Sequence, residues 1–120
     1  MTLVTFSSPA CGSCRLMLPE ARRLVEQYPR EELQLVTLHA AMGLELLKHE
    51  LKAEPQPWDH AVLGEDEHPL EKACDVRGFP TVLLIDAQGR VVNRDEGLWA
   101  NLRTEVPRIL ATQSAGAGKD

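Results

Sequence analysis

The sequence predicts an α/β fold with a central mixed β-sheet flanked by helices. β-Branched and apolar runs alternate along the chain with segments whose apolar residues recur at three- and four-residue spacing, as expected when strands alternate with amphipathic helices. The last two predicted strands are joined by a short turn, which makes that pair antiparallel. At 120 residues with 43% hydrophobic content, the chain suits one domain.

The first half of the chain predicts two strands, each followed by a helix. Thr2–Ser7 (TLVTFS) is β-branched and aromatic, which predicts a short buried strand. Ser13–Tyr28 carries one apolar stripe at helical spacing, and Pro19 inside it predicts a kink because proline lacks a backbone donor. Leu33–Leu38 is expected to form the second strand and His39–Ala53 the second helix.

The middle of the chain predicts mostly surface loop. Residues 54–69 are polar and contain two early prolines, and a short strand is expected within them at His60–Leu63. Leu70–Val76 predicts a short helix that ends near Gly78.

The last third predicts a hairpin and a final helix. Thr81–Ile85 (TVLLI) is a nearly continuous apolar run, typical of a strand buried on both faces. Asp86–Gly89 supplies turn residues before Val91–Arg94, so the two runs are expected to form a β-hairpin. Trp99–Leu110 predicts the last helix, and residues 111–120 are expected to be a disordered tail.

Charge and hydropathy exclude two classes of partner. The chain has 13 basic and 18 acidic residues, and its net charge of -5 opposes binding to phosphates, so we expect no nucleic-acid partner. No apolar run approaches the roughly 20 residues needed to cross a bilayer, and Met1–Ser8 is too short and uncharged for a signal peptide. We therefore expect a cytoplasmic monomer with no membrane segment in this chain.

Cys11 and Cys14 are the strongest candidates for chemistry. They follow the first predicted strand and open the first predicted helix, where unpaired backbone N–H groups stabilise a thiolate. A helix turns about 100° per residue, so Cys14 returns within reach of the Cys11 sulfur. A bond between them closes a very small loop, so it removes little entropy from the unfolded chain and stabilises the fold little. We therefore expect Cys11 to attack a substrate disulfide as nucleophile and Cys14 to resolve the mixed disulfide.

A metal site is the alternative that this spacing leaves open. A C-x-x-C pair is half of a structural zinc site, and two thiolates also suit a soft ion such as copper(I). Zinc needs two more ligands, yet the remaining candidates are scattered singly: Cys74, His39, His49, His60 and His68. We therefore expect no metal and no other cofactor, solvated surface positions for the histidines, and a buried apolar role for Cys74.

Several motifs together resemble the thioredoxin superfamily. They are the strand TLVTF, the motif Cys11-Gly12-Ser13-Cys14, the following Pro19, and Arg77-Gly78-Phe79-Pro80-Thr81 before an apolar strand. The match spans most of residues 2–110, and it implies a thioredoxin fold with a thioredoxin-like domain over residues 1–110.

The spacing between the cysteines and Pro80 is similar to that of the TlpA-type branch. The resemblance is carried by PWDHAVLGED and ACDVRGFPTVLLIDAQGRVV, and it implies an extra strand and helix before the Pro80 loop. Members of that branch are often exported or membrane-tethered reductants. The alternative to a cytoplasmic location is therefore an exported or tethered domain whose targeting segment is absent here.

The resemblance also implies which residues contact substrate. In the family the proline matching Pro80 is cis and lies against the disulfide, so the backbone of Phe79 would hydrogen-bond a substrate peptide. A cis bond is cheap only before proline. We expect Gly12 and Ser13, between the cysteines, to contact substrate as well.

Three features depart from the family pattern. Thr5 stands where thioredoxin has a buried acid and cannot accept the proton of Cys14, so that role is open to water, to a carboxylate such as Glu20, or to no dedicated group. Ala10 replaces the usual tryptophan before the first cysteine. The chain also starts directly at the first core strand, as expected of a minimal version or an excised domain.

The sequence thus predicts a disulfide reductase that serves cell redox homeostasis. It would act on protein disulfides and be reduced again by an unidentified partner. The alternatives are a redox-responsive binding or maturation factor without turnover and a soft-metal chaperone. Trp58 and Trp99 are expected to pack against the fold, and the acidic residues 65–67 to lie in a solvated loop.

Overall fold

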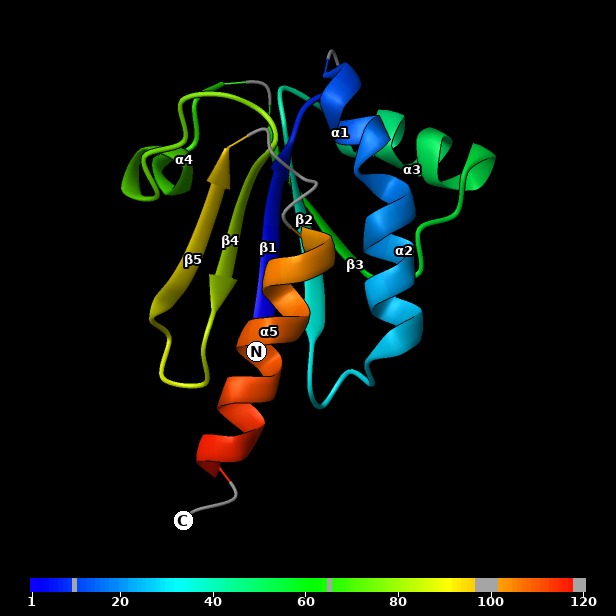
Figure 1. Ribbon diagram of the computed structural model, residues 1–120. Coiled ribbons are helices and arrows are strands. Elements are labelled where there is room, and N and C mark those ends of the chain that lie inside the picture. The colour runs from blue at the N-terminus through cyan, green and yellow to red at the C-terminus, as the bar shows by residue number, and fades with distance from the viewer. Residues whose placement is uncertain (10, 65, 97–101, 118–120) are drawn as a thin grey trace.

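The computed structural model describes residues 1–9, 11–64, 66–96 and 102–117, in which the strands form one mixed sheet (Figure 1). The strands are β1 (Thr2–Ser7), β2 (Gln34–Ala40), β3 (Asp59–Gly64), β4 (Thr81–Ile85) and β5 (Val91–Glu96). Their order is β3-β2-β1-β4-β5, with β1, β2 and β3 parallel and β4 antiparallel to both β1 and β5. The predicted mixed α/β sheet is confirmed.

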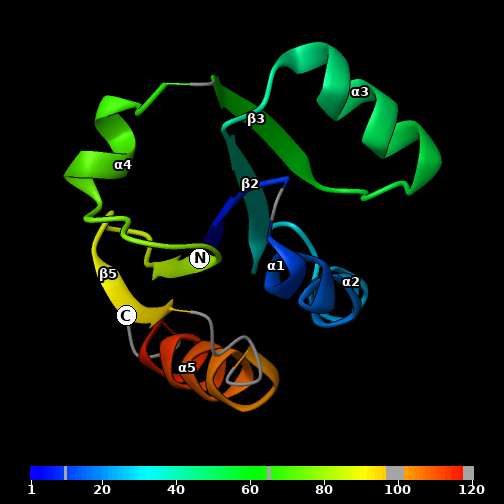
Figure 2. The same cartoon turned by 90° about the horizontal axis from the view of Figure 1, so that it is seen from above.

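The helices are α1 (Gly12–Leu16), α2 (Leu18–Gln27), α3 (Leu44–Ala53), α4 (Pro69–Ala73) and α5 (Leu102–Ala117). Seen from above, α1, α2 and α5 lie on one side of the sheet and α4 lies on the other (Figure 2). β3 and α4 are inserted between α3 and β4, where the extra strand and helix were expected.

The main core lies between one face of the sheet and the helices α2 and α5. Strand side chains alternate between two faces, so every second residue of β1, β2 and β4 points into this layer. The buried cluster comprises Leu3, Met17, Ala21, Leu24, Leu33, Leu35, Val82, Leu84, Val106, Ile109 and Leu110. Burial of each large apolar side chain stabilises the fold by about 1.5–3 kcal/mol.

The strand predictions for β1 and β4 are confirmed with the same bounds. The predicted hairpin is also confirmed, with β5 extending to Glu96. Its turn is closed by Asp86, whose Oδ1 accepts the backbone N–H groups of Gln88 and Arg90, both at 2.9 Å. Gly89 has a φ of +82°, a conformation that glycine adopts without steric cost.

The long first helix predicted with a kink at Pro19 is instead two helices. α1 ends at Leu16, and α2 begins at Leu18 with Pro19 in its first turn. Proline has no N–H to donate to the carbonyl four residues earlier but is tolerated in a first turn. The helix therefore restarts around the proline.

The second helix is shorter than predicted, because its first residues belong to a strand. His39 and Ala40 pair with Val62 and Gly64 of β3, so β2 runs on to Ala40. Ala41 then adopts a φ of +54°, and α3 begins only at Leu44. Cross-strand pairing thus overrides the helical spacing of the apolar residues here.

The C-terminal prediction is corrected where the structure describes it. α5 runs from Leu102 to Ala117, so residues 111–117 are helical and not a disordered tail, and the predicted domain boundary at residue 110 falls inside this helix. Alanine is the best helix former, and backbone bonds propagate a helix that packing has already started. The helix start predicted at Trp99 and residues 118–120 lie outside the described residues.

Candidate active site

Cys11 and Cys14 are joined by a disulfide at the junction of β1 and α1. Cys11 has the extended backbone of an N-cap residue, and its Sγ accepts the backbone N–H of Cys14 at 3.1 Å. The Cα atoms are 5.4 Å apart. Such an N–H bond favours sulfur carrying negative charge, so this local geometry suits a reactive thiolate at Cys11.

The two sulfur-bearing residues differ in exposure. Cys14 is buried at 5% exposure, whereas Cys11 is only partly buried. Gly12 and Ser13 between them are exposed, and Leu16 on the next turn is 62% exposed. A substrate can therefore approach Cys11, while Cys14 reaches only a partner already bonded to Cys11. Leu16 was expected in the buried apolar stripe of the first helix, but it is exposed because α1 ends there, and it adds an apolar contact surface beside Cys11.

Phe79 and Pro80 lie at the same end of the sheet as the cysteines. The Phe79–Pro80 peptide bond is cis. Thr81, the first residue of β4, lies opposite Phe6 near the end of β1, and β1 leads directly to Cys11. Pro80 is fully buried and Phe79 is partly exposed.

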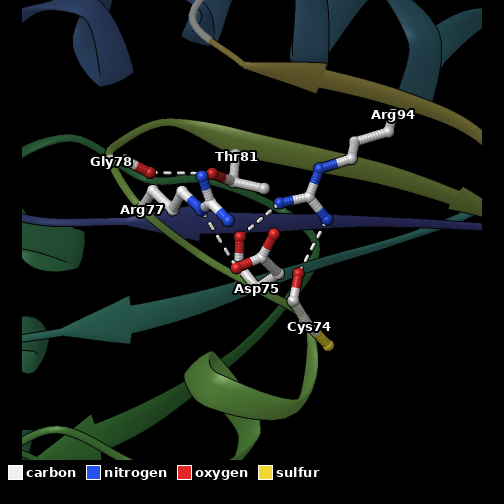
Figure 3. Close-up of polar contacts among 6 residues, drawn as sticks. All are labelled: Cys74, Asp75, Arg77, Gly78, Thr81 and Arg94. Atoms are coloured by element: carbon white, nitrogen blue, oxygen red, sulfur yellow. Dashed lines mark hydrogen bonds and ion pairs between the residues drawn. The ribbon is translucent and has the colours of Figure 1, made fainter.

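Figure 3 shows the contacts that hold the loop before Pro80. Arg94 of β5 donates Nη1 to the carbonyl of Cys74 at 2.7 Å and Nη2 to the carbonyl of Asp75 at 2.6 Å. Arg77 Nε bonds Oδ1 of Asp75 at 3.1 Å, and Thr81 Oγ1 donates to the carbonyl of Gly78 at 2.7 Å. The Arg94 bonds tie the start of the loop to β5 of the adjacent hairpin, and the Thr81 bond fastens its other end at Gly78.

A cleft lies beside the disulfide on the side facing β2 and α3. Its lining includes Cys11, Cys14, Thr37, His39 and Glu50. The prediction that the histidines are solvated surface residues is wrong for two of them. His39 is buried at 6% exposure, and its Nε2 lies 2.9 Å from Nδ1 of His60, which is only partly exposed.

The pairing of these histidines follows from the parallel register of β2 and β3, which places His60 beside Thr37 and Val62 beside His39. Burial and the neighbouring charge of His60 lower the pKa of His39 to about 4. Burial also lowers the pKa of His60, against the opposing effect of its hydrogen bond to the Gln56 carbonyl. Both rings are therefore neutral at physiological pH.

The remaining predicted residues fall outside this cleft or differ from expectation. Cys74 ends α4 as a free thiol and is only partly buried, because it lies in a loop and not in the core. Glu20, on α2, is buried at 4% exposure and lies 3.9 Å from Arg23, and it does not line the cleft. Trp58 packs against the core as expected. Ala10, Glu65 and Trp99 lie outside the described residues.

Thr5 is fully buried beneath the site. Within the described parts of the chain, its Oγ1 has no hydrogen-bond partner.

Two searches of the described residues give negative findings. No three of their histidine, cysteine, aspartate and glutamate side chains are placed to hold a metal ion. Among the same residues, no helix combines the length and apolar character required to span a membrane.

The chain matches a known protein family. The family model described as a thioredoxin-like domain matches residues 1–103. No curated protein sequence matches the chain.

Solved structures share the architecture. A thiol:disulfide interchange protein named DsbE from Chlorobium tepidum is 22% identical, with a TM-score of 0.75 over 91% of this chain and 79% of that one. A thiol-disulfide oxidoreductase from Bacteroides fragilis is 19% identical, with a TM-score of 0.71 over 85% and 78% of the two chains. StoA from Bacillus subtilis is 20% identical, with a TM-score of 0.67 over 78% and 71%. At these identities the likeness is one of fold.

Proposed function

Because this chain belongs to the thioredoxin-like domain family, we propose that it is a thiol–disulfide oxidoreductase that cycles between a Cys11–Cys14 disulfide and a dithiol. The observation that carries the proposal is the asymmetric pair at the end of β1. Cys11 is accessible and accepts a backbone N–H, whereas Cys14 is buried within bonding distance of it. The similar structures named as thiol:disulfide interchange proteins support the same chemistry.

The reaction proceeds by two exchanges. The Cys11 thiolate attacks one sulfur of a substrate disulfide, which breaks the S–S bond, joins Cys11 to one substrate sulfur and releases the other as a thiolate. Cys14 then attacks the Cys11 sulfur, closes the intramolecular disulfide and releases the second substrate thiol. The substrate gains two electrons and the protein loses two.

We assign the protein the direction of a reductase acting on protein disulfides. The exposed surface of Gly12, Ser13 and Leu16 around Cys11 leaves room for an extended substrate segment, and the Phe79 backbone offers that segment hydrogen bonds beside Pro80. A separate reducing partner would reopen the Cys11–Cys14 bond after each turnover. We place this cycle in the cytoplasm, where a disulfide is usually transient and catalytic.

The test is the reduction potential of the pair together with reduction of insulin. The protein is equilibrated in glutathione or dithiothreitol buffers, and turnover is compared with that of Cys14→Ser and of the matched control Cys74→Ser. A potential near roughly −270 mV, with turnover lost in Cys14→Ser and kept in Cys74→Ser, supports a reductase.

Other outcomes assign other roles. A potential near roughly −120 mV indicates an oxidant. A disulfide that forms without insulin turnover indicates a redox-responsive binding factor, and failure of the pair to form a disulfide in solution rejects the proposed chemistry.

A further inference from the structure

We propose that His39, oriented by His60, is the base that takes up the proton of Cys14 when this thiol attacks the mixed disulfide. The inference rests on the proposed thiol–disulfide exchange and supplies a proton acceptor for its second step. Thr5 cannot accept a proton at this pH range, and Glu20 does not line the cleft beside Cys14. His39 does line it, from the neighbouring strand β2.

The cleft provides the path for the proton. It has a volume of about 50 Å³, and Cys11, Cys14 and His39 all contribute to its wall. Room of this size admits water molecules, each of which needs at least roughly 10–15 Å³. The proton of Cys14 can thus reach the imidazole through water in the cleft.

The hydrogen bonds of the two histidines fix which nitrogen is the base. His60 Nε2 lies 3.1 Å from the carbonyl of Gln56, which only accepts, so His60 carries its proton on Nε2. Its Nδ1 is then an acceptor, and His39 must donate Nε2–H across the 2.9 Å contact. This leaves Nδ1 of neutral His39 unprotonated, and no described residue hydrogen-bonds it.

This arrangement follows the logic of an activated base. Cys14 is the nucleophile and His39 is its base. His60, itself held by the Gln56 carbonyl, orients the base and fixes its tautomer. The His39 and His60 rings lie 25° from parallel with centroids 5.2 Å apart, as their edge-to-edge hydrogen bond requires, and the Trp58 ring lies 5.6 Å from that of His60. These contacts further limit ring rotation.

The charge on the cysteines controls the basicity of His39. With the disulfide closed, no thiolate faces the ring, and its pKa is lowered by burial and by His60. A thiolate in the same cleft stabilises the imidazolium and raises that pKa. The other charged side chains lining the cleft are Arg15 of α1 and Glu50 of α3, and His60 of β3 contacts the ring itself.

The step balances as follows. The Cys14 thiol gives its proton to His39 Nδ1, and its sulfur forms a bond to Cys11 while the bond between Cys11 and the substrate sulfur breaks. The substrate leaves as a thiolate, and the His39 imidazolium gives its proton to this thiolate or to solvent, which protonates the thiolate in turn. His39 ends neutral, ready for the next cycle.

The experiment separates the two exchanges with dithiobis-nitrobenzoate as the probe. The first thionitrobenzoate released reports attack by Cys11, and the second reports resolution by Cys14. All proteins carry Cys74→Ser so that the third thiol does not react. The protein with His39 intact is compared with His39→Gln, which keeps an N–H donor toward His60 but is not a base. Glu50→Gln tests the other proton acceptor in the cleft, and His49→Gln is the control at an exposed residue.

The expected result is a second phase that slows at least about tenfold in His39→Gln near neutral pH and clearly less in Glu50→Gln, while the first phase and the His49→Gln control are unchanged. An unchanged first phase shows that the variant is folded. A plot of the logarithm of the second-phase rate against pH should have a slope close to one in His39→Gln and a smaller slope in the protein with His39. A merely structural role of His39 does not produce this difference in slope.

Two results would overturn the inference. A second phase slowed less than tenfold in His39→Gln, or an equal loss in Glu50→Gln, rejects His39 as the base while leaving the proposed function intact. Absence of any second release with His39 present rejects the proposed function and this inference together.

Discussion

Replacing buried threonines by valine should change stability in opposite directions at neighbouring positions. Thr5 and Thr37 lie opposite each other in the parallel pair β1 and β2, and both are at least 94% buried. Among the described residues, the Thr5 hydroxyl has no hydrogen-bond partner, whereas the Thr37 hydroxyl accepts Trp58 Nε1–H at 2.8 Å. Valine keeps the shape of threonine and suits a strand.

The magnitudes follow from these contacts. A buried hydroxyl without a hydrogen bond costs about 1–3 kcal/mol in mutational data, so Thr5→Val should raise the free energy of unfolding by about 1–2 kcal/mol. Thr37→Val breaks a bond and leaves the indole N–H of partly buried Trp58 unpaired, so it should lower stability by about 1 kcal/mol. The two variants should therefore differ by about 2–3 kcal/mol.

Urea unfolding of the oxidised protein, followed by Trp fluorescence and circular dichroism, measures this difference. The midpoints should move in opposite directions with unchanged slopes, since neither substitution changes the surface exposed on unfolding. A loss of 1 kcal/mol or more in Thr5→Val, on the order of one hydrogen bond, would refute the reasoning, because it would show that the hydroxyl has a partner.

Two further predictions concern the loop before Pro80 and the histidine pair. Arg94→Met removes both hydrogen bonds to the carbonyls of Cys74 and Asp75, so the KM for insulin should rise several-fold while the reduction potential stays unchanged; an unchanged KM contradicts a positioning role. The pKa of His39 is lowered from 6.5 to about 4 by burial and by His60, so the unfolded chain binds the extra proton first. Stability of the oxidised protein should therefore fall as pH drops from 6.5 toward 4, and this fall should be smaller in His39→Gln, as urea midpoints across that range would show.

Features set by neighbours in the sequence could be predicted well. The strand bounds of β1 and β4, the hairpin after Ile85, and the reach of Cys14 to Cys11 depend on side-chain alternation, turn residues and helical rise over a few positions. The Phe79–Pro80 segment was found through its resemblance to a family motif.

Other features could not be predicted because they depend on register between distant segments. The spacing of apolar residues after His39 resembles a helix, but pairing with β3 keeps its first two residues, His39 and Ala40, in the strand, and His39 is buried there. The same pairing brings His60, 21 positions along the chain, to the Nε2 of His39. Histidines that look isolated in the sequence thus become a hydrogen-bonded pair.

The sequence by itself therefore determined the fold class and the closeness of Cys11 and Cys14, since both arise from local periodicity and spacing. Only the tertiary structure decided what surrounds the disulfide: the burial of Cys14, the His39–His60 pair in the cleft, and the Arg94 bonds to the Pro80 loop. Strand register and the packing of α1 and α3 set these contacts. Which residues become neighbours across strands cannot be read from the periodicity of the sequence.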